Sequence, residues 1–366
     1  MSLTLGIDAR AATEEGAGGG RVVRELLRAL RERDEDRRYL LYARERWDEP
    51  LDERFSWRPI PAPDPIWHLR VARAASRDCD ALLSTNSYLT AWFTRVPVAP
   101  MVFDLVAFDP ALRPQRRSGS IERATLPLAV RRSAALLAIS QATADDLVRR
   151  FPAAAPKVTV APLAAPPTLE QTSASLPPGV PDDDYVLAVG TLEPRKNLPA
   201  LIAAYRRLPE DLRVRHPLVI AGRVGWEAGE TLDAVRSLGD HAIQTGFVPD
   251  DQLAALYRHC ALFAYPSLGE GFGLPVLEAM AAGAPVLTSD RSSLPEVGGD
   301  AAEYCDPTDE RSIAAALERL LRDPRRREQL RVAGPARSAL FSWASTADIV
   351  AGTLERIAGR KSGSPA

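Results

Sequence analysis

The chain has 366 residues, of which 46% are hydrophobic and 26% charged, and its formal net charge is −2 at pH 7. This length allows two domains with separate cores, and the three scattered cysteines and four histidines argue against a disulfide framework and a zinc site. Because no uncharged apolar run of about 18 residues occurs and the N-terminus opens on a strand pattern, we expect a cytosolic protein without a membrane-spanning helix.

The first half of the chain alternates short apolar runs with helical patterns. The first run covers residues 3–7, and a glycine-rich loop then leads to an amphipathic helix over about 21–33. Further strands are expected at 39–42, 55–60, 81–84, 98–103 and 134–139. Strands that alternate with helices predict a parallel sheet covered on both faces, with ligands beyond the carboxyl ends of its strands.

The second half repeats this pattern after a segment rich in Pro, Ser, Thr and Ala. We expect a first domain over 1–165, a linker over 166–184 and a second domain over 185–344. Strands of the second domain are predicted at 185–189, 217–221, 242–247 and 261–265. A last helix over about 345–360 and a tail over 359–366 complete an α/β chain.

The stretch 269–283 is the most informative one. Glu270 lies between glycines in a predicted turn from a strand to a helix, and Glu278 falls on the Leu274 face of that helix, which Gly283 ends. A helix N-terminus among glycines attracts phosphate, whereas carboxylates accept strong hydrogen bonds from sugar hydroxyls. The combination indicates a sugar nucleotide.

A second candidate site follows the strand at 185–189. Arg195 and Lys196 stand in the next loop, and Lys196 is one of only three lysines against 43 arginines. Two cations in such a loop suit a diphosphate whose negative charge grows as it leaves. The alternative is a solvated surface pair.

Several motifs give these residues a common context. Glu270 and Glu278 form an E-x7-E pattern, accompanied in order by Gly246-Phe247-Val248-Pro249 and Leu294-Pro295-Glu296-Val297. In these motifs the chain resembles the retaining glycosyltransferases of family 4, most specifically over 185–310. The resemblance implies a GT-B fold, in which two Rossmann-like domains have parallel sheets that face each other across a cleft. In this fold the first domain lies on the acceptor side, the second binds the nucleotide sugar, and the helix over about 345–360 crosses back to the first domain.

The resemblance also implies roles in the transfer of a hexose from a nucleoside diphosphate to an acceptor hydroxyl. Glu270 would hold the donor sugar, Glu278 the ribose, and Arg195 with Lys196 the departing diphosphate. The backbone amides of three residues would meet the sugar or phosphates: Phe272, Gly273 and Leu274. No metal or other cofactor is expected.

Other donor-binding positions follow from the same family. Gly18 and Gly20 match glycines that approach the donor diphosphate, and the loop of Phe247 and Val248 matches the region that binds the nucleobase.

Two positions depart from the family. Phe103 stands where a His commonly lies against the reacting sugar, and Thr191 stands where many members have Arg. Asp104, which follows Phe103, is retained, and both an orienting and a structural role are open for it. The two departures leave a second hypothesis open, a non-catalytic sugar-nucleotide-binding partner protein. A third is an epimerase of similar fold that acts on UDP-sugars.

The substrates are predicted only coarsely. The sequence motifs most resemble those of the mannosyltransferase-like branch that builds bacterial surface polysaccharides. GDP-mannose is therefore the first expectation for the donor, and a glycan or lipid-linked molecule is expected as the acceptor. A basic segment over 110–132 would suit an anionic acceptor or an anionic membrane surface, although a solvated arginine-rich face is the alternative. No nucleic-acid partner is expected.

Overall fold

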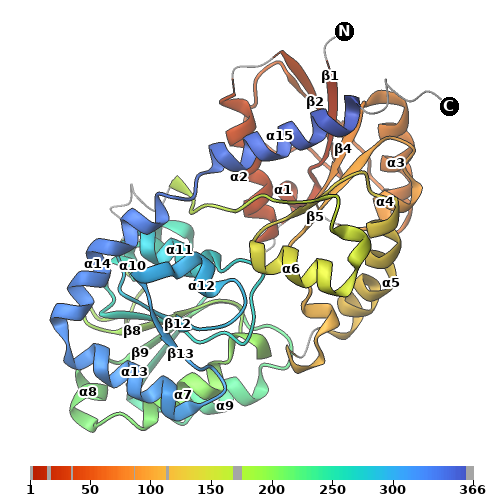
Figure 1. The fold of residues 1–366 in the computed structure, drawn as a ribbon. Helices are drawn as coiled ribbons and strands as arrows, with labels where there is room; N and C mark the ends of the chain where they lie inside the picture. The colour runs from red at the N-terminus through yellow and green to blue at the C-terminus, as the bar shows by residue number, and fades with distance from the viewer. Residues whose placement is uncertain are drawn as a thin grey trace. The chain divides into compact units, whose positions relative to one another are not determined.

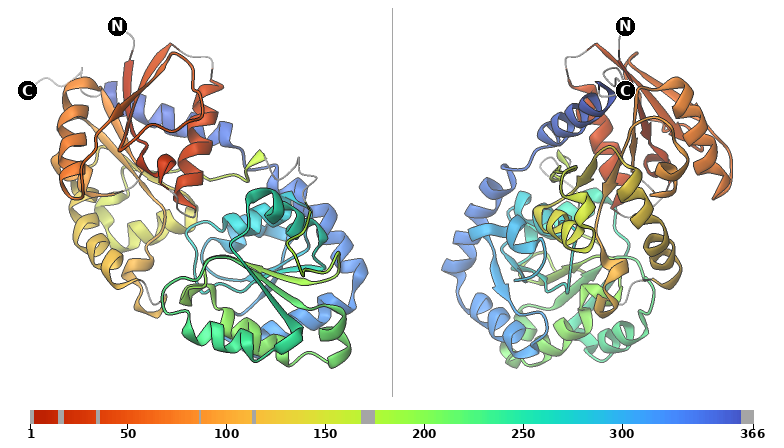
Figure 2. Two further views of the ribbon diagram at one scale, coloured as in Figure 1. Left: turned by 180° about the vertical axis from the view of Figure 1, so that it is seen from behind. Right: turned by 45° about the vertical axis from the view of Figure 1, so that its right-hand side comes forward.

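The computed structural model describes residues 3–14, 18–33, 36–85, 87–112, 115–167 and 175–359. The chain divides into two compact units. The first unit comprises residues 1–108, 116–163 and 342–366, and the second comprises 109–115 and 164–341. Figures 1 and 2 show the elements of both units.

The first unit is built on a parallel sheet with the strand order β3-β2-β1-β4-β5-β6-β7 among the described residues. Its strands are β1 (Leu3–Asp8), β2 (Arg37–Ala43), β3 (Phe55–Pro59), β4 (Ala81–Ser84), β5 (Val98–Val102), β6 (Leu136–Ala138) and β7 (Val158–Val160). The strand β7 is absent from the sequence-based expectation, because three residues are too few to show a period of two.

Helices cover both faces of this sheet, as right-handed crossovers require. After the short α1 (Arg10–Thr13), α2 (Gly19–Arg31) lies beside the C-terminal helix α15 (Trp343–Gly359) on one face (Figure 1). The other face carries α3 (Ile66–Asp78), α4 (Leu89–Phe93), α5 (Arg116–Arg132) and α6 (Gln141–Arg150). The start of α2 lies two residues before the predicted one, because Gly18 adopts a φ of +62° at its N-cap.

The second unit has a parallel sheet in the order β10-β9-β8-β11-β12-β13 among the described residues. Its strands are β8 (Val186–Val189), β9 (Leu218–Ala221), β10 (Ala242–Gly246), β11 (Leu262–Tyr265), β12 (Val286–Ser289) and β13 (Glu303–Cys305). The central strands are buried along their length, since helices cover both faces.

The helices of the second unit form two layers. One contains α7 (Leu198–Arg206), α9 (Gly229–Arg236) and α13 (Glu310–Arg322), and a short α8 (Glu210–Arg215) follows α7. The other contains α10 (Asp250–His259), α11 (Leu274–Ala281), α12 (Leu294–Gly298) and α14 (Pro324–Ser338). In the part of the chain that the structure describes, no helix has the length and apolar character needed to cross a bilayer.

Candidate active site

The strand order of the second unit brings the two predicted charged loops together. Strands β8 and β11 are parallel neighbours, with Val186 opposite Leu262 and Leu187 opposite Phe263. Their following loops therefore emerge at the same sheet edge. The loop after β8 carries Arg195 and Lys196, and the loop after β11 carries Glu270.

Glu270 is the centre of a buried polar cluster. Its Oε2 pairs with Nη1 of Arg195, and its Oε1 lies 2.7 Å from Nζ of Lys196. The hydroxyls of Tyr265 and Ser267 donate to the same Oε1 over 2.8 and 2.7 Å. The side chains of Glu270 and Lys196 are only 7% and 10% exposed, so the two cations are not a solvated surface pair.

The charges in this cluster perturb one another. Burial by itself would raise the pKa of Glu270, but Arg195 and Lys196 outweigh it and lower this pKa to about 2. Burial, with the nearby Arg195 guanidinium, lowers the pKa of Lys196. Burial and the Glu270 charge raise the pKa of the Tyr265 hydroxyl well above its usual value, which keeps that hydroxyl a proton donor. At neutral pH the cluster therefore holds one carboxylate between two cations.

The cluster retains hydrogen-bonding capacity on one side. Within the described residues, Oε1 of Glu270 receives bonds from Lys196, Tyr265 and Ser267, whereas Oε2 receives one from Arg195. A carboxylate oxygen can accept two bonds, so Oε2 has room for a donor such as a sugar hydroxyl. A diphosphate in reach of Arg195 and Lys196 would share them with Glu270.

Residues that sequence reasoning missed hold the cluster in place. Glu193 is 5% exposed and its Oε1 forms an ion pair with Nε of Arg195 at 2.5 Å, and burial raises the pKa of Glu193 despite that arginine. Asn197 adopts the left-handed conformation and donates from Nδ2 to the carbonyls of Pro266 and Pro307, which ties three loops of this sheet edge together. A sequence signal existed for Glu193, because it stands two residues before Arg195 in the same strand-to-helix loop.

The start of α11 follows directly from Glu270. Gly273 is the N-cap residue with a φ of +106°, and α11 begins at Leu274 as expected. Phe272 is buried and its ring meets Phe341 edge to face. Glu278 is also buried, on α11, where Oε2 accepts from the Tyr257 hydroxyl over 3.3 Å. Its contact with a donor ribose stays a prediction.

The loops after β9 and β10 present a different surface. Phe247 is 61% exposed, and the Arg223 guanidinium lies over its ring at 4.3 Å, whereas Val248 is buried. Thr191 is half-buried, and its Cγ2 fills the space where a Cβ on Gly225 would stand, at 2.7 Å. The contact therefore requires glycine at position 225.

The remaining predicted residues belong to the first unit. Gly18 and Gly20 begin α2, and a Cβ on Gly20 would stand 2.6 Å from the Ala11 carbonyl oxygen. Phe103 and Asp104 follow β5. Oδ1 of Asp104 accepts from the Val106 amide over 3.0 Å, which is a turn-forming role. Asn86 lies outside the described residues.

The basic segment 110–132, whose helix α5 belongs to the first unit, is only partly available to a ligand. On α5, Arg123 donates to the carbonyl of Ala107 and Arg132 to that of Trp92, whereas Arg116, Arg117 and Arg131 are exposed. Burial and the Asp104 charge raise the pKa of Glu122, on the same helix, to about 8. Arg113 lies outside the described residues.

Comparison with known proteins matches both halves of the chain. Residues 177–337 match the family described as glycosyl transferases group 1, and residues 16–168 match glycosyltransferase family 4. The chain belongs to glycosyltransferase family 4. The group 1 match contains the whole Glu270 cluster, and the family 4 match contains Gly18, Gly20, Phe103 and Asp104.

Family members of similar sequence include two proteins of Escherichia coli. The O-antigen chain mannosyltransferase B is 45% identical over 161 residues, which is 43% of this chain and 42% of that protein. The serotype-specific mannosyltransferase WbdA is 45% identical over 171 residues, which is 46% of this chain and 21% of that protein. The chain thus matches less than half the length of either relative.

The fold comparison covers nearly the whole chain. The sucrose-phosphate synthase of Thermosynechococcus elongatus superposes with a TM-score of 0.75 at 18% sequence identity, over 98% of this chain and all of that one. This likeness establishes the GT-B fold for the family member described here.

Proposed function

We propose that this protein is a retaining glycosyltransferase that moves a hexose from a nucleoside diphosphate to a hydroxyl of a glycan or lipid-linked acceptor. The bond between the anomeric carbon and the diphosphate breaks, and a bond to the acceptor oxygen forms on the same face of the sugar. The acceptor proton goes to the departing diphosphate oxygen, so the products are the glycoside and a nucleoside diphosphate. The reaction as proposed uses no metal.

The observation that carries this proposal is the buried contact of Glu270 with Arg195 and Lys196 at the carboxyl ends of β8 and β11. The two cations are held by ion pairs with Glu270 and are mostly buried, so they would stabilise charge on the leaving diphosphate more than exposed cations would. Glu270 stays ionised and has a free acceptor position on Oε2 for a sugar hydroxyl. The amides of Gly273 and Leu274 stand next to it, at the start of α11.

Mannose from GDP-mannose is the proposed donor. Its support is the 45% identity to two proteins described as mannosyltransferases. An anionic membrane surface beside the acceptor is part of the same proposal and is supported only by the exposed arginines of α5.

The test compares GDP-, UDP-, ADP- and dTDP-sugars. Binding is measured first by thermal shift, and turnover is then measured by release of the nucleoside diphosphate. A bound donor stabilises the protein by mass action, so we expect the largest shift with GDP-mannose, followed by slow hydrolysis without an acceptor. The variant Glu270→Gln should lose at least about 100-fold in turnover. The control variant Glu310→Gln, which removes an exposed ion pair with Arg207, should keep the wild-type turnover.

One outcome would favour a second function. Phe103 and Thr191 replace residues that many family members use, and a non-catalytic binding partner would show the thermal shift without any release of nucleoside diphosphate. Absence of binding for every sugar nucleotide would contradict both functions.

A further inference from the structure

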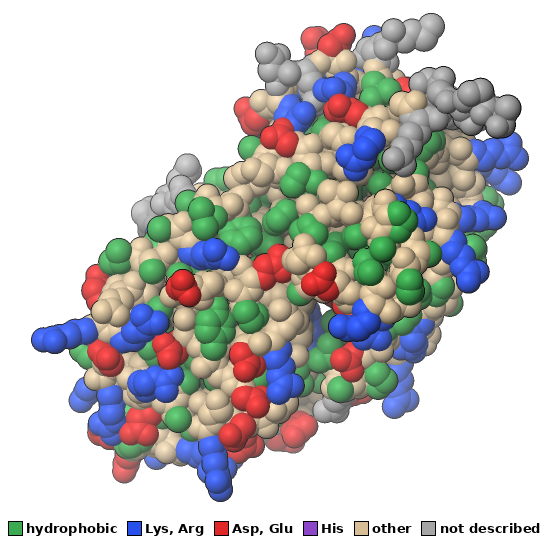
Figure 3. All heavy atoms as spheres, in the orientation of Figure 1, with side chains coloured by type: hydrophobic (Ala, Val, Ile, Leu, Met, Phe, Trp, Pro, Cys, Tyr) green, Lys and Arg blue, Asp and Glu red, His purple; other side chains and the backbone are tan. Residues whose placement is uncertain are grey.

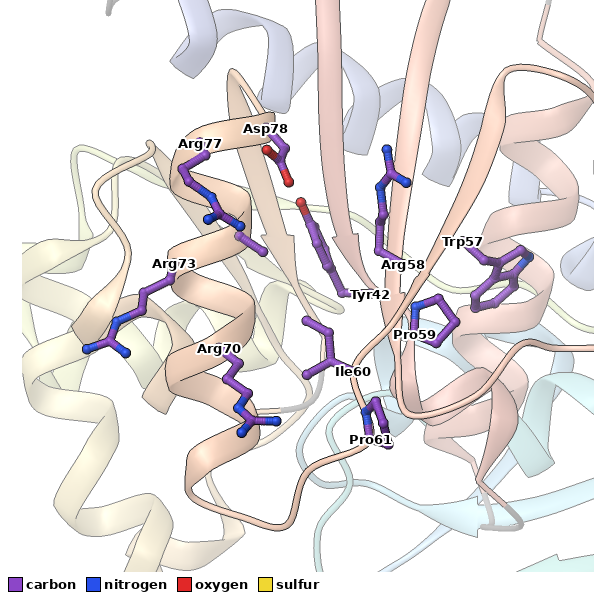
Figure 4. A pocket seen from close by; sticks show the side chains of 11 residues that line it. Tyr42, Trp57, Arg58, Pro59, Ile60, Pro61, Arg70, Arg73, Arg77 and Asp78 are labelled. Carbon is purple, nitrogen blue, oxygen red and sulfur yellow. The ribbon is translucent and has the colours of Figure 1, made fainter.

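A surface pocket of about 580 Å³ lies in the first unit, between α3 and the strands β2 and β3. Figure 4 shows Arg70, Arg73 and Arg77 along α3 and Arg58 of β3 across from them, with Tyr42 and Ile60 in between. The volume is in the range of small-molecule sites. No function discussed above uses these residues, and the Glu270 cluster lies in the other unit.

The shape of the sheet explains why the pocket exists. The strand β3 is at the edge of the sheet, and α3 packs nearer its centre, against β1 and α4. On this side of the sheet α3 covers β2, whose Leu40 and Tyr42 are buried, but it leaves the edge strand β3 exposed at Ser56 and Arg58. Spacings of three and four residues place Arg70, Arg73 and Arg77 along one side of α3, although Figure 4 shows the Arg73 side chain directed away from β3.

The arginines of the pocket are unpaired. Within the described residues, none of the four guanidinium groups forms a hydrogen bond or an ion pair, and all four residues are exposed. By contrast Arg28, Arg54 and Arg150 of the same unit are each held by a carboxylate. Like charges gathered without a counter-ion repel one another, so an anion in this pocket would be bound favourably.

The floor of the pocket is apolar. Ile60, Pro61 and Ala74 line it together with the ring of Tyr42, which is itself fully buried. Asp78 is the one acidic side chain in the lining. Figure 3 shows that Lys and Arg side chains gather along the α3 and α5 side of the first unit. The chemistry that fits is an anionic group attached to an apolar body.

We propose that this pocket binds a phosphate group carried on an apolar chain, with Arg58, Arg70 and Arg77 on the phosphate and Ile60, Pro61 and Ala74 against the chain. Guanidinium groups bind phosphate oxygens through paired N–H donors, and several acting together compensate for the weakness of each exposed contact. The inference goes beyond the proposed transfer reaction and stands whether or not that reaction is correct.

The test uses monomeric short-chain phosphatidic acid in calorimetric titration of the full chain, with inorganic phosphate and the matching neutral diglyceride as separate arms. We expect saturable binding of phosphatidic acid that weakens with added salt. Arg70→Gln combined with Arg77→Gln should weaken it about tenfold. The control double variant, Arg206→Gln with Arg215→Gln, removes the same number of positive charges at exposed positions of the second unit. It should leave the affinity for phosphatidic acid unchanged.

A variant that should strengthen binding distinguishes a loss of binding from a folding defect. Asp78→Asn removes the acidic group of the pocket and should raise the affinity about threefold, which a damaged pocket would not do. Vesicles of phosphatidylcholine with and without phosphatidic acid then distinguish a membrane headgroup from a monomeric ligand, and binding of either source supports the shared chemistry. Equal binding of inorganic phosphate would overturn the role of the apolar floor. Unchanged affinity in the α3 double variant would overturn the site.

Discussion

Lys196 is a buried charged residue, so its ion pair with Glu270 and its packing both constrain the same side chain. Its ammonium lies 2.7 Å from Glu270 and is bound to Tyr265, and its buried stem lies beside Gly190, where a Cβ would be in ordinary van der Waals contact with Cε at 3.5 Å. In a chain with 43 arginines, a lysine here has a steric reason, because the planar guanidinium needs more width than an ammonium.

We therefore expect Lys196→Arg to be poorly tolerated although it keeps the charge. Overpacking of the buried site should lower the free energy of unfolding by about 2 kcal/mol and should lower donor binding. Urea unfolding and the thermal shift with donor measure the two effects. Lys157→Arg is the matched control, because Lys157 is half-buried and bonds to the Arg131 and Ser133 carbonyls. Wild-type stability in Lys196→Arg would contradict the steric argument.

Asp8 shows a buried charge of a different kind. It ends β1 with no exposed surface, and its Oδ2 has no hydrogen-bond partner among the described residues. Burial raises its pKa to about 7, although Arg10 acts in the opposite direction. Because the folded pKa lies above the unfolded value, the folded chain binds the proton more tightly, and this stability is lost as the pH rises from about 4 through about 7.

Asp8→Asn should remove that pH dependence. At about pH 3.5 and below the variant should resemble the wild type, and at about pH 8 it should be the more stable of the two by on the order of 4 kcal/mol. Urea unfolding across this pH range measures the difference. Asp48→Asn, at an exposed position, serves as the control and should show no such trend. A difference that is constant with pH would show that Asp8 does not titrate in this range.

At the scale of an element, the start of α11 depends on one backbone conformation. Gly273 holds φ at +106°, and a Cβ at this position would lie 2.7 Å from Cδ2 of Leu294 at the start of α12. The left-handed conformation turns the chain from the Glu270 loop into the helix, so that the first amides of α11 follow the carboxylate directly.

Gly273→Ala should therefore cost about 2 kcal/mol in unfolding free energy and weaken donor binding. A Cβ added at Gly352, within α15, would have no neighbouring heavy atom within 4 Å. Gly352→Ala should therefore be neutral or slightly stabilising, since alanine favours a helix. Thermal unfolding of both variants, with and without donor, makes the comparison. Equal behaviour of the two would mean that the glycine conformation at the start of α11 is not required.

For the molecule as a whole, each unit is assembled from segments that are not continuous in the sequence. The chain leaves the second unit after residue 341, and α15 returns to the first, where it packs on α2 and above β4 and β5. Val350, Leu354 and Ile357 of α15 are fully buried in that packing. The first unit therefore needs the last helix of the chain to close its core.

Matched core variants should separate the two units. Leu354→Ala in α15 and Leu317→Ala in α13 both remove a side chain with no exposed surface, and each should cost about 3 kcal/mol. Hydrogen exchange read out by mass spectrometry should show loss of protection in the first unit for Leu354→Ala and in the second for Leu317→Ala. If both variants loosen the same elements, the division into units does not describe cooperative folding.

The α/β class, most strands and the family motifs can be read from the sequence, because apolar periodicity and glycine-rich turns are local properties. The sequence also predicts that Arg195, Lys196 and Glu270 lie in loops after buried strands. That β8 and β11 are neighbours, and that Glu193, Tyr265, Ser267 and Asn197 complete the cluster, is visible only in the folded chain. The short β7, β12 and β13 and the arginine pocket beside α3 were likewise invisible. Strand order and the burial of a charge are set by contacts between residues far apart in the chain, and no local pattern encodes them.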